Sequence, residues 1–490
     1  MHSLLRSARS LFLLPLAGAM ALAGCAETDD STVRVVVIGQ PSSPFDGGVR
    51  LSPAAQLVRS STFEGLVGFD EQGRVIPALA DRWIVTDDGQ SYIFRLREGE
   101  WPDGTPLTGE SVRIALRRAI GELRGTPLGL DLAAIADIRA MAGRVVEIRL
   151  ERPVADMLQL LAQPELGLAR KARGTGPMVL RRDGNVAILT PLPPEKRGLP
   201  AVSDWQEQTR TIQLTAHPAA AAIERFDKGE ADLVLGGTID EFPRLAARRL
   251  ARGTIRMDAV TGLFGLSVLS SEGFLANPAN REALSMAIDR EGMMTGFGIS
   301  GWIPTTRIVS PGIDTGNVAV EERWALMTLD ERRAEAARRV QEWAEPVTLR
   351  IALPDGPGAD LLFASIAEDL GTIGVTAVRA AQDAPAELRL VDAVARYPRS
   401  GWFLNQFSCR AGRVPCSAAA DSWQAQANAA ADDATRDRLA AEAEAALAAT
   451  NIFIPFGTPV RWSLARGSLT GFSINRWGYH PLMPLAMRPR

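Results

Sequence analysis

The sequence predicts an α/β protein with two large lobes, because a strand, a helix and a second strand follow one another twice along the chain. The first unit covers residues 211–235 and the second covers residues 347–391. Units of this length favour parallel strands. Between residues 68 and 120, short strands separated by turns precede a helix, which indicates a smaller α+β region. A chain of 490 residues is long enough for two or three such domains.

In the N-terminal third, each expected element follows from a local pattern. Runs of β-branched residues predict strands, and proline and glycine predict turns. Thr108 is placed to cap the helix that follows it. The expected order is a strand at 33–38, a turn-rich connection at 40–48, a helix at 51–67, strands at 83–85 and 92–96 around a turn at 87–89, and a helix that contains residues 112–120.

The two strand, helix, strand units have equally local signals. Pro218 has the fixed φ that suits the start of a helix. The first unit is expected to have strands at 211–214 and 232–235 around a helix at 218–228; the second is expected to have strands at 347–351, 375–378 and 387–391 with a helix at 360–373. The later alanine-rich segments 328–344 and 431–449 are expected to be helices with a solvated face.

The first 25 residues have the features of an export signal. Two arginines precede an apolar run over residues 11–20, which is shorter than the roughly 20 residues of a membrane-spanning helix. The sequence Leu-Ala-Gly-Cys then ends at Cys25 and resembles a bacterial lipobox, in which the cysteine is acylated before cleavage. We expect residues 1–24 to be removed and acylated Cys25 to anchor the protein to a bacterial membrane, facing the periplasm or the cell exterior. The alternative is a plain secretory signal.

The other two cysteines, Cys409 and Cys416, are expected to form a disulfide. An even pair in an oxidising compartment is most simply explained in this way. The alternative is two buried free thiols.

Composition excludes several classes of function. The formal net charge is -3, so no excess of positive charge is available to hold a phosphate backbone, and nucleic acid is not an expected partner. None of the three lysines belongs to a phosphate-binding loop, and the mature chain has two distant histidines, His217 and His480. No nucleophile motif or dinucleotide fingerprint is present. We therefore expect no catalysis, no cofactor and no metal site.

Nearly the whole mature chain resembles the family 5 extracellular solute-binding proteins, the dipeptide, oligopeptide and nickel-binding class. The first matching segments, in the order and spacing of the family, are 62–67, 76–83, 87–89, 92–99 and 101–108. Further matches are 174–177, 226–232, 281–290 and Pro455.

The resemblance implies a two-lobed fold of the periplasmic-binding-protein type, type II, cluster C, with a small α+β domain inserted near the N-terminus. It implies a first lobe of residues 25–47, 173–262 and 466–490, a small domain of residues 48–172, and a second large lobe of residues 263–465. The lobes of such proteins rotate about a hinge and close on a solute, and a permease then recognises the closed shape.

The chain departs from the family pattern at Arg396. In peptide-binding members, this position holds an aspartate that pairs with the α-ammonium group of the ligand, and an arginine there would repel that group. Four arginines and no acid lie between Asp392 and Asp421. One hypothesis is a site in which Arg396 and Arg399 hold a carboxylate or phosphate of the solute. The alternative is that these arginines pair with acids elsewhere or face solvent.

Five further residues are candidates for ligand contact. Gln40 and Phe45 follow the first strand at its carboxyl end, where open α/β sheets bind ligands. Phe63 and Glu64 lie in the matching motif, and Trp402 is suited either to stacking on a ligand or to a place in the core.

The sequence therefore predicts a monomeric, lipid-anchored receptor of an ABC importer that works with a membrane permease. Its expected ligand is a peptide-like or other small organic solute, anions included. The alternative is a lipid-anchored sensor or scaffold that keeps the fold without serving a permease. An exported hydrolase is disfavoured by the missing nucleophile motifs.

Overall fold

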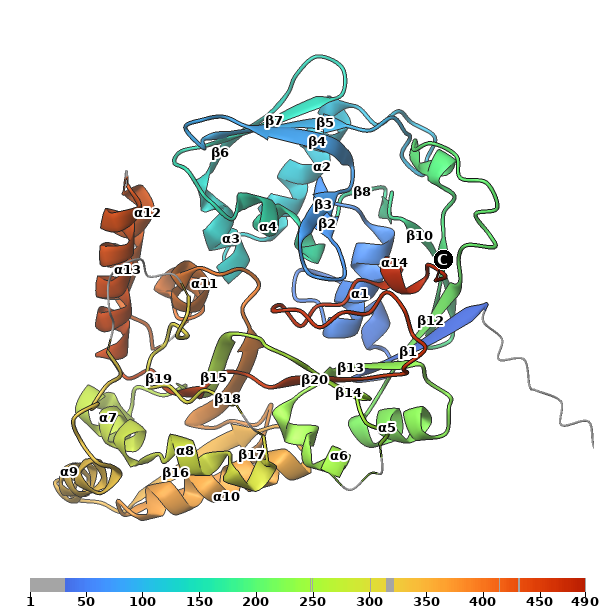
Figure 1. Ribbon diagram of the computed structural model, residues 1–490. Helices are drawn as coiled ribbons and strands as arrows, with labels where there is room; N and C mark the ends of the chain where they lie inside the picture. Colours follow the sequence, from blue (N-terminus) through green and yellow to red (C-terminus); the bar gives the residue numbers. More distant parts are fainter. Residues whose placement is uncertain are drawn as a thin grey trace, which may run out of the picture. The chain divides into compact units, whose positions relative to one another are not determined.

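A seven-stranded sheet forms the centre of the first lobe in the computed structural model, which describes residues 31–246, 248, 250–299, 301–313, 321–413, 415–430 and 432–489 (Figure 1). The strand order is β10-β11-β12-β1-β13-β20-β14. The bounds are β1 (Thr32–Ile38), β10 (Met178–Asp183), β11 (Val186–Pro191), β12 (Thr211–His217), β13 (Leu233–Gly237), β14 (Ile255–Asp258) and β20 (Arg461–Ala465).

The two strands of the first predicted unit are parallel, as expected, but a third strand lies between them. β12 and β13 are each parallel to β1, which lies between them, and α5 (Ala219–Asp227) connects them. Alternate side chains of β1 pack in two different hydrophobic cores, because successive side chains of a strand point to opposite faces of the sheet. Val33, Val35 and Val37 pack with α1 (Pro53–Thr62), and Val36 packs with α5.

The small domain is built on an antiparallel sheet of order β4-β5-β7-β6. Its elements are β4 (Ala80–Val85), β5 (Ser91–Leu96), α2 (Gly109–Glu122), α3 (Pro127–Asp131), β6 (Ile135–Ala140), β7 (Val145–Leu150) and α4 (Met157–Leu161). Thr108 caps α2 as predicted, since its side chain accepts from the main-chain N–H of Ser111 and the Ser111 hydroxyl accepts in return.

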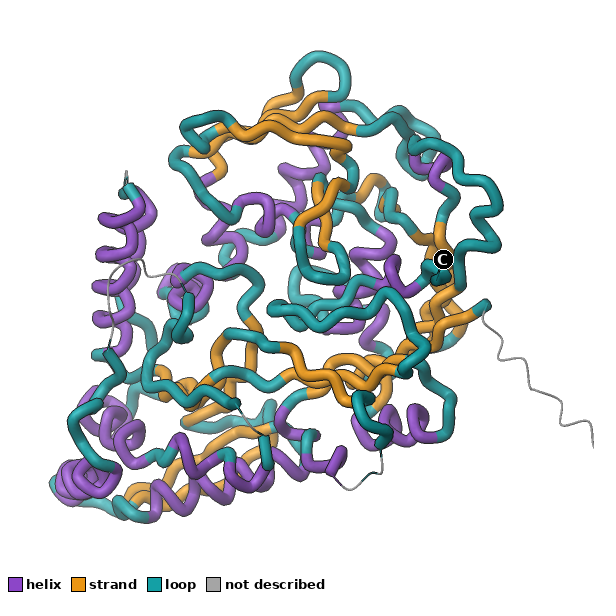
Figure 2. Tube along the Cα trace, viewed as in Figure 1, coloured by secondary structure: helices purple, strands orange, loops and turns teal. Residues whose placement is uncertain are grey.

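The second large lobe has a five-stranded sheet of order β17-β16-β18-β15-β19. Its strands are β15 (Gly262–Val268), β16 (Val347–Leu353), β17 (Val375–Ala381), β18 (Leu388–Val394) and β19 (Phe453–Gly457). β16 and β17 pair in parallel across α10 (Pro357–Gly371), as the sequence predicts. The other helices are α7 (Pro278–Ala287), α8 (Arg290–Met293), α9 (Leu329–Gln341), α11 (Ser400–Asn405), α12 (Ala418–Ala429) and α13 (Asp433–Ala448). Figure 2 shows that α10 lies along this sheet, whereas α12 and α13 extend away from it.

Short elements complete the chain. They are β2 (Val67–Phe69), β3 (Val75–Pro77), β8 (Ala169–Arg170), β9 (Arg173–Gly174), α6 (Pro243–Ala246), α14 (Leu482–Leu485) and the 3-10 helices η1 (Ser43–Phe45), η2 (Leu132–Ala134), η3 (Pro164–Leu166), η4 (Pro194–Arg197), η5 (Ile239–Glu241), η6 (Gly273–Ala276), η7 (Thr295–Phe297) and η8 (Cys409–Ala411).

Two chain segments connect the large lobes. Residues 259–261 lead from β14 to β15, and residues 458–460 lead from β19 back to β20. Beside these crossings, Arg461 of β20 forms an ion pair of 2.7 Å with Asp392 of β18, so a charge pair joins the lobes where they meet.

Two of the expected lobe boundaries are wrong. The family resemblance implies that β20 belongs to the second lobe, but β20 pairs with β13 and β14 of the first lobe, so that boundary lies at the crossing 458–460. The resemblance also implies that α1 belongs to the small domain, but its apolar side covers the seven-stranded sheet. The physical reason in both cases is packing against a distant strand, which is not visible in a local pattern. We keep the name small domain for residues 67–172.

The predicted disulfide between Cys409 and Cys416 is present, with a Cα–Cα distance of 5.2 Å. Replacing both cysteines by serine is expected to lower the free energy of unfolding by about 2.5 kcal/mol, because the disulfide restricts an unfolded loop of eight residues. Urea denaturation of the double variant beside the wild type measures this difference. An unchanged denaturation midpoint would contradict the prediction.

Cys25 and the export signal lie outside the described residues. Within the described ranges, no helix combines the length and the apolarity required to cross a bilayer. In the same ranges, no group of three or more His, Cys, Asp or Glu side chains is placed to hold a metal ion.

Candidate functional site

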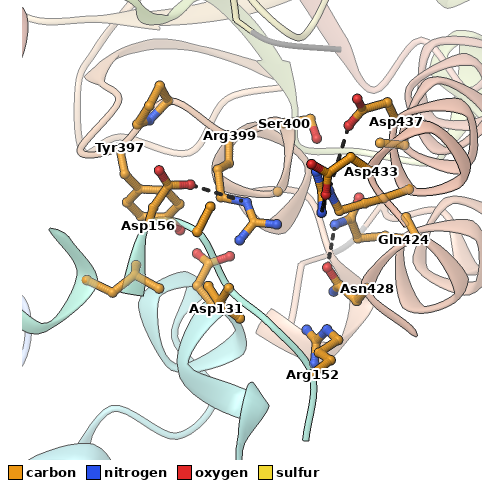
Figure 3. Close-up of a pocket in the computed structure, with 18 residues that line it drawn as sticks. Asp131, Arg152, Asp156, Tyr397, Arg399, Ser400, Gln424, Asn428, Asp433 and Asp437 are labelled. Atoms are coloured by element: carbon orange, nitrogen blue, oxygen red, sulfur yellow. Dashed lines mark hydrogen bonds and ion pairs between the residues drawn. The ribbon is translucent and has the colours of Figure 1, made fainter. Parts of the chain in front are cut away.

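A cavity of about 440 Å³ lies between the small domain and the second large lobe (Figure 3). The small domain contributes the end of α3 and the segment after β7, with Asp131 and Arg152–Asp156. The second lobe contributes residues 397–401 at the start of α11 and the facing sides of α12 and α13. α11 also packs directly on α3, so the cavity lies where the two parts of the molecule meet.

Local sequence signals place the side chains that line this cavity. Pro398 ends the extended segment after β18, and Arg399 is the N-cap residue of α11. Asp432 caps α13 by accepting from the main-chain N–H of Thr435, which puts Asp433, Arg436 and Asp437 in the first turns of that helix. The acids Asp432 and Asp433 thus begin a helix, as their position in the sequence indicates.

The lining carries both signs of charge. Its carboxylates are Asp131, Asp156, Asp433 and Asp437, and its cations are Arg152, Arg399 and Arg436. Arg436 pairs with Asp433 at 2.6 Å, and Arg399 lies 3.5 Å from Asp156. Arg152 forms no ion pair within the described part of the chain, and burial together with the neighbouring Arg399 lowers its pKa.

Three buried polar atoms of this lining have no hydrogen-bond partner among the described residues. They are Oδ2 of Asp131, Oε1 of Gln424 and the hydroxyl of Tyr397. The other oxygen of Asp131 accepts a hydrogen bond of 2.7 Å from the side-chain amide of Asn405. A buried polar atom without a partner costs about 1–3 kcal/mol, so three in one cavity indicate a place for a molecule with donor groups.

Burial raises the pKa of the Asp131 carboxyl to about 8, although Arg399 and the hydrogen bond from Asn405 oppose the shift. Burial likewise raises the pKa of Asp156. A carboxyl in this state accepts a cationic group readily, because a positive charge nearby restores the ionised form.

Asp131 is expected to make the free protein less stable as the pH rises from about 4 to about 8. Its pKa is higher in the folded chain than the ordinary value of about 3.9, so the folded state retains the proton that the unfolded state loses. The free energy of unfolding should fall by up to about 1.4 kcal/mol per pH unit in this window. Urea midpoints of wild type and Asp131→Asn, measured across the window, test the effect.

The difference between the two proteins isolates Asp131, because the other titrating groups are common to both. Asp137→Asn is the matched control, since Asp137 is paired with arginines and its pKa is lowered. A constant difference between wild type and Asp131→Asn across the window would contradict the prediction.

Among the described residues, three polar contacts join the small domain to the second lobe. Arg396 forms an ion pair of 2.6 Å with Glu165, whose side chain is 4% exposed. The contacts of Arg399 with Asp156 and of Asn405 with Asp131 lie at the cavity itself. The small domain and the second lobe are therefore held together by side chains from segments far apart in the sequence.

Of the candidate residues from the sequence, Arg399 lines the cavity and Arg396 lies beside it in the chain. Both form ion pairs with acids of the small domain, which is the alternative considered for them. Trp402 is 6% exposed and packs edge-on against Phe403, so it belongs to the core.

The other candidates lie elsewhere. Glu64 is 6% exposed, and its two oxygens are occupied by Arg97 and Arg197, each at 2.6 Å. Gln40 is exposed, and the ring of Phe45 lies under the guanidinium of Arg182. Phe63 lines a different cavity. The structure does not bring these four residues together with Arg399.

Sequence reasoning missed most of the cavity. Asp131 is the last residue of the short helix α3, Arg152 and Asp156 lie between β7 and α4, and Gln424 lies on an alanine-rich helix. Charged and amide side chains at such positions usually face water, so no local signal separates them from a solvated surface. Of the described lining residues, Arg399 is the one that the sequence predicts as a candidate.

Comparison with known proteins gives the family. Residues 74–389 match the sequence profile of the bacterial extracellular solute-binding proteins, family 5 Middle. The chain is 38% identical over 136 residues to the probable deoxycholate-binding periplasmic protein YgiS of Escherichia coli K12, covering 24% of this chain and 25% of that protein. It is 24% identical over 398 residues to the nickel-binding periplasmic protein of the same strain, covering 74% of this chain and 71% of that protein. The alignments span 25% to 58% of the length of the first three curated relatives.

The fold is that of two-lobed periplasmic binding proteins. The structure of the Escherichia coli murein tripeptide binding protein MppA matches with a TM-score of 0.80 at 19% identity, covering 94% of this chain and 99% of that one. An unliganded open form of MppA matches with a TM-score of 0.60 at 18% identity, covering 94% of this chain and 96% of that one.

Proposed function

This chain belongs to the bacterial extracellular solute-binding proteins of family 5, and we propose that it is the extracytoplasmic receptor of an ABC importer. Members of this family are binding proteins rather than enzymes. In this proposal, a small solute settles between the small domain and the second lobe, the lobes close, and a membrane permease takes the solute from the closed receptor.

The observation that carries the proposal is the cavity between the small domain and the second lobe. Its three unpartnered polar atoms belong to both sides, Asp131 to the small domain and Tyr397 and Gln424 to the second lobe. A solute that bonds to all three gains these contacts when the lobes are together. Such differential affinity is what allows a ligand to favour closure.

The charges of the cavity support a solute with an ammonium and a carboxylate group. Oδ2 of Asp131 and Oε1 of Gln424 are acceptors suited to an ammonium group. Arg152, which has no ion pair among the described residues, is suited to a carboxylate. A short peptide has both groups, and relatives are named for murein peptide, oligopeptide and glutathione binding.

An anionic solute held by Arg396 and Arg399, the other hypothesis from the sequence, is less well supported. Each of these arginines already has an acid partner in the small domain. Binding an anion there requires the solute to displace Glu165 or Asp156.

A set of matched dipeptides tests the proposed function in thermal unfolding of the mature chain without its lipid. Ala-Ala is compared with acetylated Ala-Ala, which lacks the ammonium group, and with Ala-Ala amide, which lacks the carboxylate. At 100 times its dissociation constant, a solute should stabilise the folded state by about 2.7 kcal/mol. We expect the largest stabilisation from the unmodified peptide, and at least about tenfold weaker binding after Asp131→Asn or Arg152→Gln.

Asp330→Asn, on the exposed start of α9, is the control and should bind like the wild type. If neither these peptides nor a broad set of amino acids, organic acids, sugars and metal ions shifts the midpoint, the sensor or scaffold alternative is favoured over the receptor.

The lipid anchor belongs to the same proposal. Acylation of Cys25 would hold a monomeric receptor at a bacterial membrane, facing the periplasm or the cell exterior and close to its permease. Mass spectrometry of the protein from membranes should show a diacylated N-terminal cysteine, and Cys25→Ala should remove the protein from the membrane fraction. An unmodified N-terminus at another residue would leave a plain secretory signal.

A further inference from the structure

A second and larger cavity lies between the first lobe and the small domain. Its volume is about 920 Å³, and its lining residues lie between Thr62 and Gly198. The described residues of the second lobe and of the two crossings at 259–261 and 458–460 contribute nothing to this lining. This cavity is therefore separate from the solute cavity described above.

One part of the wall is apolar and accessible. Val179 and Leu180 come from β10, the edge strand of the seven-stranded sheet, and Val179 is 51% exposed (Figure 1). Leu192, just after β11, and the ring of Phe63 add to this surface. An apolar group bound here would be removed from water, which is favourable by about 25 cal/mol for each Å² buried.

Another part of the wall is basic. Arg173 and Lys196 are exposed and form no ion pair within the described ranges. Arg97 and Arg197 share the buried carboxylate of Glu64 behind the wall. The acids of the lining are Glu100 and Glu195, so the four basic side chains leave positive charge in excess even after Glu64 is counted.

Two buried donors in this wall lack a partner among the described residues. They are the hydroxyl of Thr175, a residue that is 9% exposed, and Nε of Arg197. An arginine N–H can only donate, so it requires an acceptor from elsewhere. Thr175 is held rigidly, because the N–H of Gly176 donates to the Thr62 carbonyl at 2.9 Å and any side chain at Gly174 or Gly176 would overlap Thr62.

We propose that this cavity is a second binding site, which takes an amphipathic anion. Its carboxylate or phosphate group is held by Arg173, Lys196 and the two unpartnered donors, and its apolar part lies against the β10 surface. The site is independent of the proposed importer function and of the solute cavity, since no lining residue is common to the two cavities. The anion comes either from solution or from the surface of a membrane.

Three probes with the same ten-carbon chain test the proposal by calorimetric titration of the mature chain. They are decanoate, decyl phosphate and decyltrimethylammonium, each kept below the concentration at which it forms micelles. Decanoate and decyl phosphate are expected to bind at one site, and the cation is expected to bind at least about tenfold more weakly, because its charge meets the basic wall.

Variants locate the site. Arg173→Ala combined with Lys196→Ala should weaken decanoate binding by at least about tenfold, and Thr175→Val, which keeps the side-chain shape, should weaken it by about fivefold. Arg118→Ala is the matched control, since Arg118 is an exposed arginine of the small domain outside the cavity, and it should leave the affinity unchanged. Equal binding of all three probes, no binding of either anion, or wild-type affinity in the Arg173 and Lys196 double variant would each overturn the proposal.

Vesicles distinguish the two sources of the anion. A membrane lipid is the source if the lipid-free chain sediments with phosphatidylglycerol vesicles but not with phosphatidylcholine vesicles. The double variant should then no longer sediment with the phosphatidylglycerol vesicles. Binding of decanoate without such sedimentation would assign an anion from solution. Either result supports an amphipathic anion, and the solute-binding test with dipeptides is unaffected by both.

Discussion

Glu64→Gln is expected to lower the free energy of unfolding by about 3–5 kcal/mol, because it removes the negative charge between two arginines that are out of water. Glu64 is 6% exposed, and its partners Arg97 and Arg197 are 5% and 16% exposed. Glutamine keeps the shape and one acceptor oxygen, so the variant tests the charge itself. Urea denaturation gives the free energy of unfolding directly.

The matched control for Glu64 is Glu110→Gln. Glu110 also pairs with an arginine, Arg113, but its side chain is 56% exposed, and such surface pairs contribute about 0–1 kcal/mol. Solute affinity well below the denaturation temperature should stay unchanged in Glu64→Gln, since Glu64 does not line the solute cavity. If Glu64→Gln were about as stable as the wild type but no longer bound the solute, Glu64 would be a ligand-binding residue and the prediction would be wrong.

Arg396→Asp is expected to shift the protein from the closed to the open arrangement of its lobes by more than about 100-fold. The variant places an acid against Glu165, which is 4% exposed, in place of Arg396, which is 32% exposed. Breaking a fully buried ion pair costs about 3–5 kcal/mol, and here the repulsion between two acids adds to the part of that cost that the exposure of Arg396 leaves. This cost applies while the small domain and the second lobe are together, because residues 165 and 396 belong to different parts of the molecule and lose their contact when these parts separate. Spin labels at two exposed positions, Ile84 of the small domain and Leu326 of the second lobe, report the distance distribution.

Reversing the pair is the control for Arg396. The double variant Glu165→Arg with Arg396→Glu restores opposite charges, and its distance distribution should return toward that of wild type. An unchanged distribution in Arg396→Asp alone would show that the contact with Glu165 does not hold the lobes together.

Several motif residues serve the fold rather than the ligand. Glu64 belongs to the segment 62–67 that carries the family resemblance, and it is fully engaged by arginines. Arg290, in the matching segment 281–290, is buried and donates to the main-chain carbonyls of Pro455 and Ser285 at 2.8 and 3.1 Å. The sequence signals that identify the family are thus partly requirements of packing.

The sequence by itself determined the features that depend on near neighbours. The capping of α2 by Thr108, the hairpin of β4 and β5, the parallel pair β16 and β17, and the disulfide of Cys409 and Cys416 all follow from residues within one turn, one hairpin or one unit. Hydrophobic periodicity and capping are short-range effects, so a single sequence carries them.

Only the tertiary structure decided which distant groups meet. β1 lies between β12 and β13 in the sheet. Arg396 forms an ion pair with Glu165, which lies 231 residues away in the sequence. The solute cavity is assembled from the small domain and the second lobe. Asp131, whose Oδ2 has no hydrogen-bond partner among the described residues, resembles any helix-end acid until α11 packs on α3. The physical reason is that desolvation and charge pairing depend on the surroundings that the fold creates. The residues next to each group in the sequence do not determine these surroundings.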